Sequence, residues 1–378
     1  MGMGYQGFVK MYASGPATSP SVLLATGASV NLVLEPIYSS AVWGAGWYNA
    51  ATAAHYADSA IRYEGTVDVE MQFGAAGIIW DFLEDWIVTY RAYPKSLDIS
   101  PDGSRLYQYR TAGAYHATTT FDTPPAGGAF NTSAGFSTSE GSFLTASLGV
   151  VALTRAEYDP TGAANNYSNF SYLMQRRGVI GSDCSVFSTT NPLNPSGTNV
   201  NPIPFWRTNA QLLTGASYTP FSGGSLPQTN TQTVEWSVDV SQGSIWLYVC
   251  NGSRLPIALL QGPMDVSGSV TLFHQNGVFD PILGPDGVSG TLTSPYLYAE
   301  NTWFRVTIAG GPSGNVYMDV PAVVIEGDDY SIPGLDAVVN RVFSIKGLGG
   351  RCYSNRVLPP FLMSSSAGSM PTSWDAAS

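Results

Sequence analysis

The sequence predicts a mainly β protein with two tandem modules, each a β-sandwich or a barrel-like sheet, and with one helix in the first module. Three observations support this: many short stretches alternate apolar and polar residues, one strand pattern returns about 200 residues later, and turn-forming residues are abundant. The 378 residues include 41 Gly and 25 Pro, and only 11% are charged. A chain of this length fits one large or two medium domains, and we favour two.

The internal repeat is centred on two glycines. Gly65, Val67 and Val69 align with Gly268, Val270 and Leu272. An alternating strand lies upstream of each segment, and with an offset that differs by one residue Val30, Leu32 and Leu34 match Val234, Trp236 and Val238. Such repetition indicates two copies of one supersecondary unit.

The first half begins with strands expected over 5–12, 22–35 and 61–72. The period then changes to 3.6, which predicts one helix ended by Pro94, with its apolar face at Ile79, Phe82, Leu83, Trp86, Ile87 and Tyr90. Further strands are expected over 96–100, 105–110, 114–122 and 142–155. Residues 123–141 are low in complexity and are predicted to form a flexible loop.

The second half begins near Ile203. Strands are expected over 232–240, 244–250, 254–260, 264–274, 302–309, 315–326 and 336–347, and Asn251-Gly252 indicates a hairpin turn. The predicted organisation is a first module over 1–160, a linker over 161–202, a second module over 203–351 and a C-terminal arm over 352–378.

Composition argues against several classes of function. The net charge is −11 with only 16 Lys and Arg, so a basic patch for nucleic acid is missing. Cys184, Cys250 and Cys352 are widely spaced and are expected to be free thiols without a metal. No window reaches the roughly 20 apolar residues of a membrane span, and we expect no secretory signal at the start, where no charged region is followed by an apolar core.

Catalytic and metal sites are not expected. The three histidines, His55, His116 and His274, have no Ser, Cys or carboxylate at a recognisable spacing. The acidic pairs Glu84-Asp85 and Asp328-Asp329 offer too few oxygen ligands for a calcium loop. We therefore expect neither an enzyme nor a cofactor.

Two groups of residues remain as candidate sites. The first is a Gly-rich segment between two strands that carries Trp43, Trp47, Tyr48 and Tyr56. These aromatics fit three roles, namely local core packing, stacking on sugars, or contact with another subunit. The second is the polar face of the strands, with Thr66, Asp68 and Glu70 opposite Val67 and Val69; Asn31, Glu35, Glu235, Ser237 and Asp239 extend it on other strands.

Six segments stand out by their glycines, strand patterns and aromatics: Ala25-Thr-Gly-Ala-Ser-Val-Asn-Leu32, Trp43-Gly-Ala-Gly-Trp-Tyr-Asn49, His55-Tyr-Ala-Asp58, Ile61-Arg-Tyr-Glu-Gly65, Gly262-Pro-Met-Asp-Val-Ser-Gly-Ser-Val270 and Val339-Asn-Arg-Val-Phe-Ser344. They resemble the tail tube proteins of long-tailed bacteriophages. The resemblance covers most of both halves, and the matching positions are structural glycines, strands and aromatics.

This resemblance implies a virion protein whose sheets join into rings stacked around a channel for DNA ejection. Two modules per chain imply three chains per ring, with six single-module chains as the rival. The implied partners are other copies, a tape measure protein, a tail terminator and DNA that passes without specific binding. Assembly would take place in the host cytoplasm, and the protein would end in the virion tail.

The resemblance also gives the candidate residues roles. Glu35, Asp68, Glu70 and Asp239 would line the channel, where a neutral or acidic wall repels DNA weakly. Trp43, Trp47, Tyr48 and Tyr56 would contact the next ring. The alternative from another class is a carbohydrate-binding or adhesin-like β-sandwich, which would use the same aromatics against sugars and remain a monomer.

Overall fold

The structure is a computed structural model of the whole chain. It describes residues 8–12, 21–23, 25–38, 56–71, 96–100, 106–110, 115–116, 130–152, 154–158, 203–214, 218–221, 233–250, 258–273, 302–311, 314–330 and 339–364. These residues are almost all in β-strands, which confirms the mainly β class.

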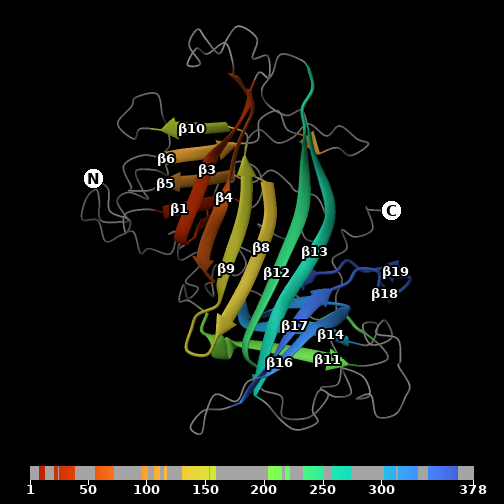
Figure 1. Cartoon of the computed structure of the whole chain (residues 1–378). Helices are drawn as coiled ribbons and strands as arrows, with labels where there is room; N and C mark the ends of the chain where they lie inside the picture. The colour runs from red at the N-terminus through yellow and green to blue at the C-terminus, as the bar shows by residue number, and fades with distance from the viewer. Residues whose placement is uncertain are drawn as a thin grey trace, which may run out of the picture.

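The largest sheet contains strands from both halves of the chain (Figure 1). Its strand order is β16-β17-β13-β12-β8-β9-β4-β3, with the short β7 (Tyr115–His116) beside β13. The eight strands are β3 (Ala25–Tyr38), β4 (Tyr56–Glu70), β8 (Phe130–Ser139), β9 (Thr145–Ala152), β12 (Thr233–Leu247), β13 (Ala258–Phe273), β16 (Val323–Tyr330) and β17 (Asn340–Gly347).

Two smaller sheets, a short hairpin and one 3-10 helix, η5 (Phe205–Arg207), complete the described fold. The first-half sheet has the order β10-β6-β5-β1-β2, and the second-half sheet has the order β11-β14-β15-β20. Their strands are β1 (Phe8–Tyr12), β2 (Ser21–Leu23), β5 (Ser96–Ser100), β6 (Leu106–Arg110), β10 (Thr154–Tyr158), β11 (Thr208–Thr214), β14 (Thr302–Gly311), β15 (Gly314–Val320) and β20 (Leu362–Ser364). The hairpin pairs β18 (Cys352–Tyr353) with β19 (Arg356–Val357).

The two halves have the same strand order. In the large sheet the first half contributes the order β3-β4-β9-β8 and the second half the order β12-β13-β17-β16. In each half the first hairpin (β3–β4 or β12–β13) therefore lies beside a second strand pair (β8–β9 or β16–β17) whose later strand is the inner one. In the smaller sheets the order β1-β5-β6-β10 corresponds to β11-β14-β15-β20. The repeat seen weakly in the sequence is therefore a repeat of eight strands in two sheets.

Strand pairing fixes which residues correspond. Val30 pairs with Gly65 in the first hairpin, and Val238 pairs with Gly268 in the second. Val30 thus corresponds to Val238, and the sequence-based match of Val30 to Val234 is wrong by four residues. Alternation cannot detect this error, because a shift by an even number keeps every side chain on its face.

The two hairpins also share their irregularities. The first has register shifts between Ala25 and Gly27 and between Glu35 and Pro36. The second has shifts at the corresponding end, between Thr233 and Glu235, and between Gln242 and Ser244. Bulges bend a strand at a defined place, so their repetition shows that the two hairpins follow the same path.

Gly65 and Gly268 are required for the same physical reason. A Cβ atom at Gly65 would lie 1.8 Å from the carbonyl oxygen of Ser29, and one at Gly268 would lie 2.3 Å from that of Ser237. Ser29 and Ser237 are corresponding residues of the two hairpins. In each copy the backbone of the first strand lies too close for any side chain.

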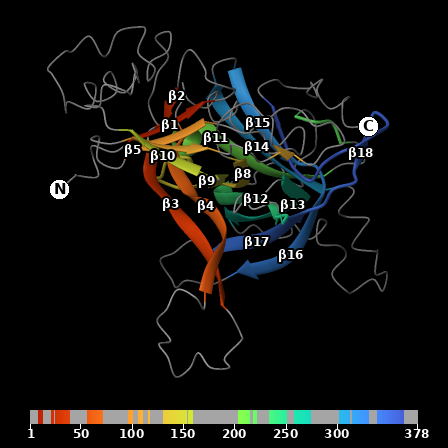
Figure 2. The same cartoon turned by 90° about the horizontal axis from the view of Figure 1, so that it is seen from above.

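One continuous core joins the large sheet to both smaller sheets. It includes Val67 and Leu97 of the first half and Val238 and Val306 of the second. Viewed from above, β3–β4 and β16–β17 bend to the side away from the smaller sheets (Figure 2). The large sheet therefore has a packed face and, on its concave side, an open face.

Several sequence-based expectations need correction or fall outside the described residues. The flexible loop predicted over 123–141 is wrong for 130–139, which form β8 in the middle of the sheet. Its Ser, Thr and Gly residues are typical of loops, but alternate positions such as Ala134 and Phe136 are buried. The predicted helix over 79–90 and the predicted linker over 161–202 lie outside the described residues. Residues 352–364 of the predicted arm form β18, β19 and β20.

Candidate assembly edges and polar sheet face

The two halves are joined in the large sheet by antiparallel pairing of β8 with β12. Seven register pairs run from Ser133–Ser241 to Ser139–Glu235. The joint is also packed, because Phe136 of β8 lies under Phe361 of the second half with ring centroids 6.5 Å apart. Thus β8, the outer strand of the first half in this sheet, pairs with β12, the first strand of the second half in the same sheet.

The strands that correspond to β8 and β12 in the other half form the two ends of the large sheet. β16 corresponds to β8, and β3 corresponds to β12. Within the described part of the chain, β16 pairs only with β17, and β3 pairs only with β4. Each end therefore presents a row of backbone N–H and C=O groups that another strand can pair with.

The exposed fractions of side chains differ between β3 and its counterpart β12. Leu32 and Leu34 are 47% and 46% exposed, whereas the corresponding residues Val240 and Gln242 are 1% and 6% exposed. Val240 lies between β8 and β13, while among the described strands Leu32 has only β4 beside it. The apolar edge of β3 is exposed where its copy in the second half is covered.

The open face of the large sheet carries mostly small polar residues. One row of register partners crosses all eight strands: Gly27, Asp68, Ser147, Gly135, Asp239, Ser267, Lys346 and Val324. The next row contains Glu70, Thr145, Ser137, Ser237, Ser269, Ser344 and Gly327. Hydroxyl groups bond across strands, with Ser237 Oγ 2.9 Å from Ser269 Oγ and Ser137 Oγ 3.1 Å from Thr145 Oγ1.

Three of the predicted channel residues, Asp68, Glu70 and Asp239, lie on this face, with β9 and β8 between Asp68 and Asp239. The carboxylate of Asp68 accepts a hydrogen bond of 2.5 Å from Ser147 Oγ. Partial burial raises the pKa of Asp239. The fourth, Glu35, belongs to β3, but its side chain is not among those described.

Basic residues on the face are paired with acids. Lys346 Nζ lies 2.5 Å from Asp265 Oδ1, and Arg62 forms an ion pair with Glu64. Lys346 of β17 is thus a basic residue on this face, opposite Ser267. Glu70 and Asp239 still leave the face acidic, because each of these two basic residues is matched by an acid.

Three of the predicted contact aromatics, Trp43, Trp47 and Tyr48, lie outside the described residues. Tyr56 begins β4 and pairs with Tyr38 at the tip of the first hairpin. The corresponding tip of the second hairpin exposes three apolar residues: Ile245 at 63%, Tyr248 at 39% and Val249 at 44%. The two hairpins extend the same end of the sheet (Figure 1).

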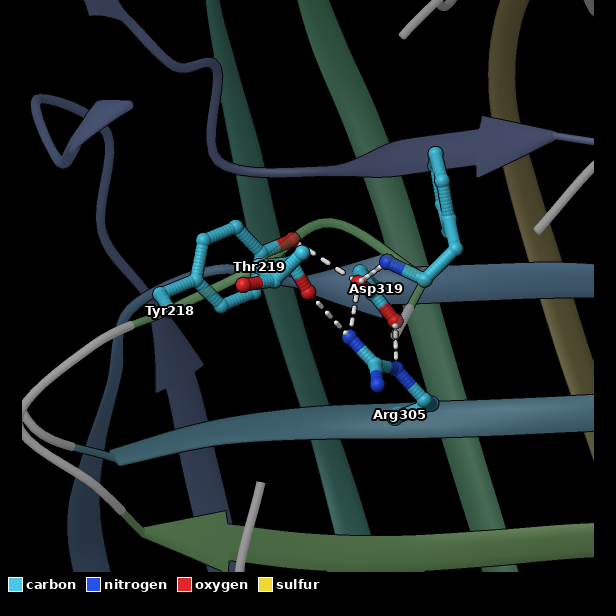
Figure 3. A network of polar contacts seen from close by, with 5 residues as sticks. Tyr218, Thr219, Arg305 and Asp319 are labelled. Carbon is cyan, nitrogen blue, oxygen red and sulfur yellow. Dashed lines mark hydrogen bonds and ion pairs between the residues drawn. The ribbon is translucent and has the colours of Figure 1, made fainter. Parts of the chain in front are cut away.

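A buried polar network in the second half was missed by the sequence analysis (Figure 3). Arg305 of β14 bonds both oxygens of Asp319 on β15 at 2.7 Å, and its Nη2 also donates to the Thr219 carbonyl at 2.9 Å. Asp319 Oδ2 accepts from Tyr218 Oη and from the Phe221 amide, both at 2.8 Å. The signal in the sequence that could have revealed this network is a single charged residue in each of two mostly apolar strands, Arg305 in β14 and Asp319 in β15.

The surroundings of the network indicate a structural role. Asp319 and Arg305 are 0% and 4% exposed. Burial lowers the pKa of Arg305, but the hydrogen bonds and charge of Asp319 outweigh it and raise the pKa overall. Burial also raises the pKa of Tyr218, as does the adjacent Asp319 carboxylate. The network keeps residues 218–221 attached to the sheet through fixed charges.

Neither metal chemistry nor a membrane helix is found in the described residues. Among them, His, Cys, Asp and Glu form no group of three that could hold a metal ion. The same part of the chain contains no helix long and apolar enough to cross a bilayer. The strongest features of the described surface are thus the two free sheet edges and the polar face.

Comparison with known proteins adds little. No family model matches the chain, and no curated protein matches it. Among solved structures, the hybrid NMR and cryo-EM structure of the SPP1 tail tube matches 47% of this chain and 85% of its own, with 14% identity and a TM-score of 0.26.

Proposed function

We propose that this protein is a structural subunit that assembles into rings and stacks them into the tail tube of a bacteriophage. The observation that carries the proposal is the internal pairing of β8 with β12 together with free edges of the same two kinds at β16 and β3. Repeating the internal contact between chains adds copies in one direction, because the two faces of the contact differ. A head-to-tail contact of this kind closes a ring when its rotation divides a full turn.

Three chains per ring is the number we propose. Each chain supplies two copies of the module, and the tail tube family that the sequence resembles builds rings of six. Half of the six joints would then be β8–β12 joints within chains, and half would be joints between chains.

The open polar face would line the channel. It lies on the concave side of the sheet, away from the two smaller sheets (Figure 2). Its residues are mostly Ser, Thr and Gly, with Asp68, Glu70 and Asp239 adding negative charge. Short hydroxyl side chains and a weakly repulsive charge would let DNA slide without holding its phosphates.

Negative-stain microscopy of the purified protein tests the proposal. We expect tubes of uniform diameter once the protein is concentrated, and a reconstruction with Asp68 and Asp239 on the inner wall. A protein that stays monomeric at every concentration and binds a glycan array would instead support the carbohydrate-binding alternative. Tubes with Asp68 on the outer wall would refute the channel assignment.

A further inference from the structure

We infer that β16 of one chain pairs with β3 of the next in the register that β8 and β12 already use within the chain. This inference rests on the proposed function. The chain thus contains the pattern for its own subunit contact, and the partner is a second copy.

Correspondence between the two halves gives the register residue by residue. Gly327 corresponds to Ser133, because each follows a bulge and pairs one residue before the partner of the central glycine. Val33 corresponds to Ser241 through the two hairpins. Since Ser133 pairs with Ser241, Gly327 is expected opposite Val33 of the next chain. The pairs that follow are Asp328–Leu32, Asp329–Asn31 and Tyr330–Val30.

The bulge supports this alignment independently of the glycines. β8 has a register shift between Asn131 and Ser133 against β9, and β16 has one between Ile325 and Gly327 against β17. In the internal joint, pairing with β12 ends at Ser133, directly beside the bulge. The same stop exists on β16, so pairing with β3 should end at Gly327.

Residue chemistry fits the inferred pairing at the open face. In register, Tyr330 takes the position of Phe136, so an aromatic residue stands at this position in both strands, and Asp328 takes the position of Ala134. On the open face, Asp329 lies opposite Asn31, just as Asp239 lies opposite Gly135 inside the chain. Each of these pairs contains only one carboxylate, so the contact avoids like-charge repulsion.

The contact would also cover the exposed edge of β3. Leu32 lies within the inferred pairs and Leu34 directly beyond them, and both are about half exposed. Val240, at the position of Leu32 in the internal joint, is 1% exposed. A second copy on this edge would therefore restore the burial that the internal joint already has.

Cysteine cross-linking tests the register. We would combine Asn31→Cys with Asp329→Cys, since residues directly opposite each other in a sheet have Cβ atoms about 4.5–5.5 Å apart, within reach of a disulfide. The matched control joins Asp329→Cys with Ser29→Cys, two residues along on the same face, about 7–8 Å away. Both variants are made with serine at the three native cysteines: Cys184, Cys250 and Cys352.

The expected result is rapid cross-linking of assembled Asn31→Cys/Asp329→Cys subunits on mild oxidation, at least tenfold faster than in the control. With three chains per ring, the covalent products would stop at three chains. Normal tubes in which the control pair cross-links faster would refute the register but keep the proposed function. Absence of tubes and of cross-links in both variants and in the parent protein would refute the proposed function itself.

Discussion

The edge of β3 gives the sharpest prediction, because the chain contains its own matched control. Leu32 and Val240 occupy the same position in the two halves, but they are 47% and 1% exposed. Full burial of a leucine stabilises a protein by about 1.5–3 kcal/mol. In the free subunit Leu32→Asp should therefore cost about 1 kcal/mol, which most domains tolerate.

The same substitution at Val240 should have a much larger effect on the free subunit. It would remove a fully buried side chain and place a carboxylate in the core, so we expect a cost above about 4 kcal/mol. Urea unfolding should show Leu32→Asp close to the parent protein and Val240→Asp largely unfolded. Equal destabilisation by both would mean that the edge of β3 is not free.

On assembly, in contrast to folding, Leu32→Asp should have a large effect. The new carboxylate would be covered by the next chain and would lie opposite Asp328, and a cost of about 3 kcal/mol weakens association about 100-fold. Sedimentation velocity and negative-stain microscopy should show folded subunits without tubes. Tubes at the same protein concentration as the parent would refute the assignment of β3 as an assembly edge.

Substitutions at Asn31, Arg305 and Gly65 test the inferred pairing, the buried network and the close backbone approach. Asn31→Lys should strengthen the contact with Asp329 of the next chain by about 0.2–1 kcal/mol, and Asn31→Asp should weaken it by the same amount. Tube assembly at low and high salt would measure both effects. Equal effects of the two substitutions would contradict the pairing. Arg305→Met should destabilise the subunit by about 3–5 kcal/mol in urea unfolding, since it leaves a buried carboxylate without its partner; a loss below about 1 kcal/mol would remove the structural role of the network. Gly65→Ala should destabilise the first hairpin because a Cβ there would meet backbone at 1.8 Å, while Gly243→Ala, with nothing within 4 Å, is the control and should be neutral; similar losses in both would contradict the close approach.

The sequence predicted the strands and the repeat better than their alignment. Gly65 and Gly268 were matched correctly, and at both positions a Cβ atom would meet the backbone of the neighbouring strand. The strands upstream were aligned four residues away from their true position, because alternation repeats every two residues. β8 was missed for a related reason: a strand facing a polar surface with Ser, Thr and Gly has the composition of a loop.

The polar face was predicted from alternation, but the assembly edges were not. Asp68, Glu70 and Asp239 could be placed on one face because side chains alternate along each strand. Which strands end the sheet depends on the pairing of β8 with β12, a contact between residues about 100 positions apart. Local patterns carry no information about that pairing, so the free edges became visible only in the structure.

Charge on the two free edges favours the head-to-tail contact over symmetric ones. β16 carries Glu326, Asp328 and Asp329, whereas the inferred pairing segment of β3, residues 30–33, has no charged residue. Two β16 strands facing each other would bring six acids together, and like charges directly opposite destabilise a strand pair. Pairing of β16 with β3 places those acids against neutral residues. The same acids discourage random edge-to-edge aggregation of free subunits, so the contact that remains favourable is the one that closes rings.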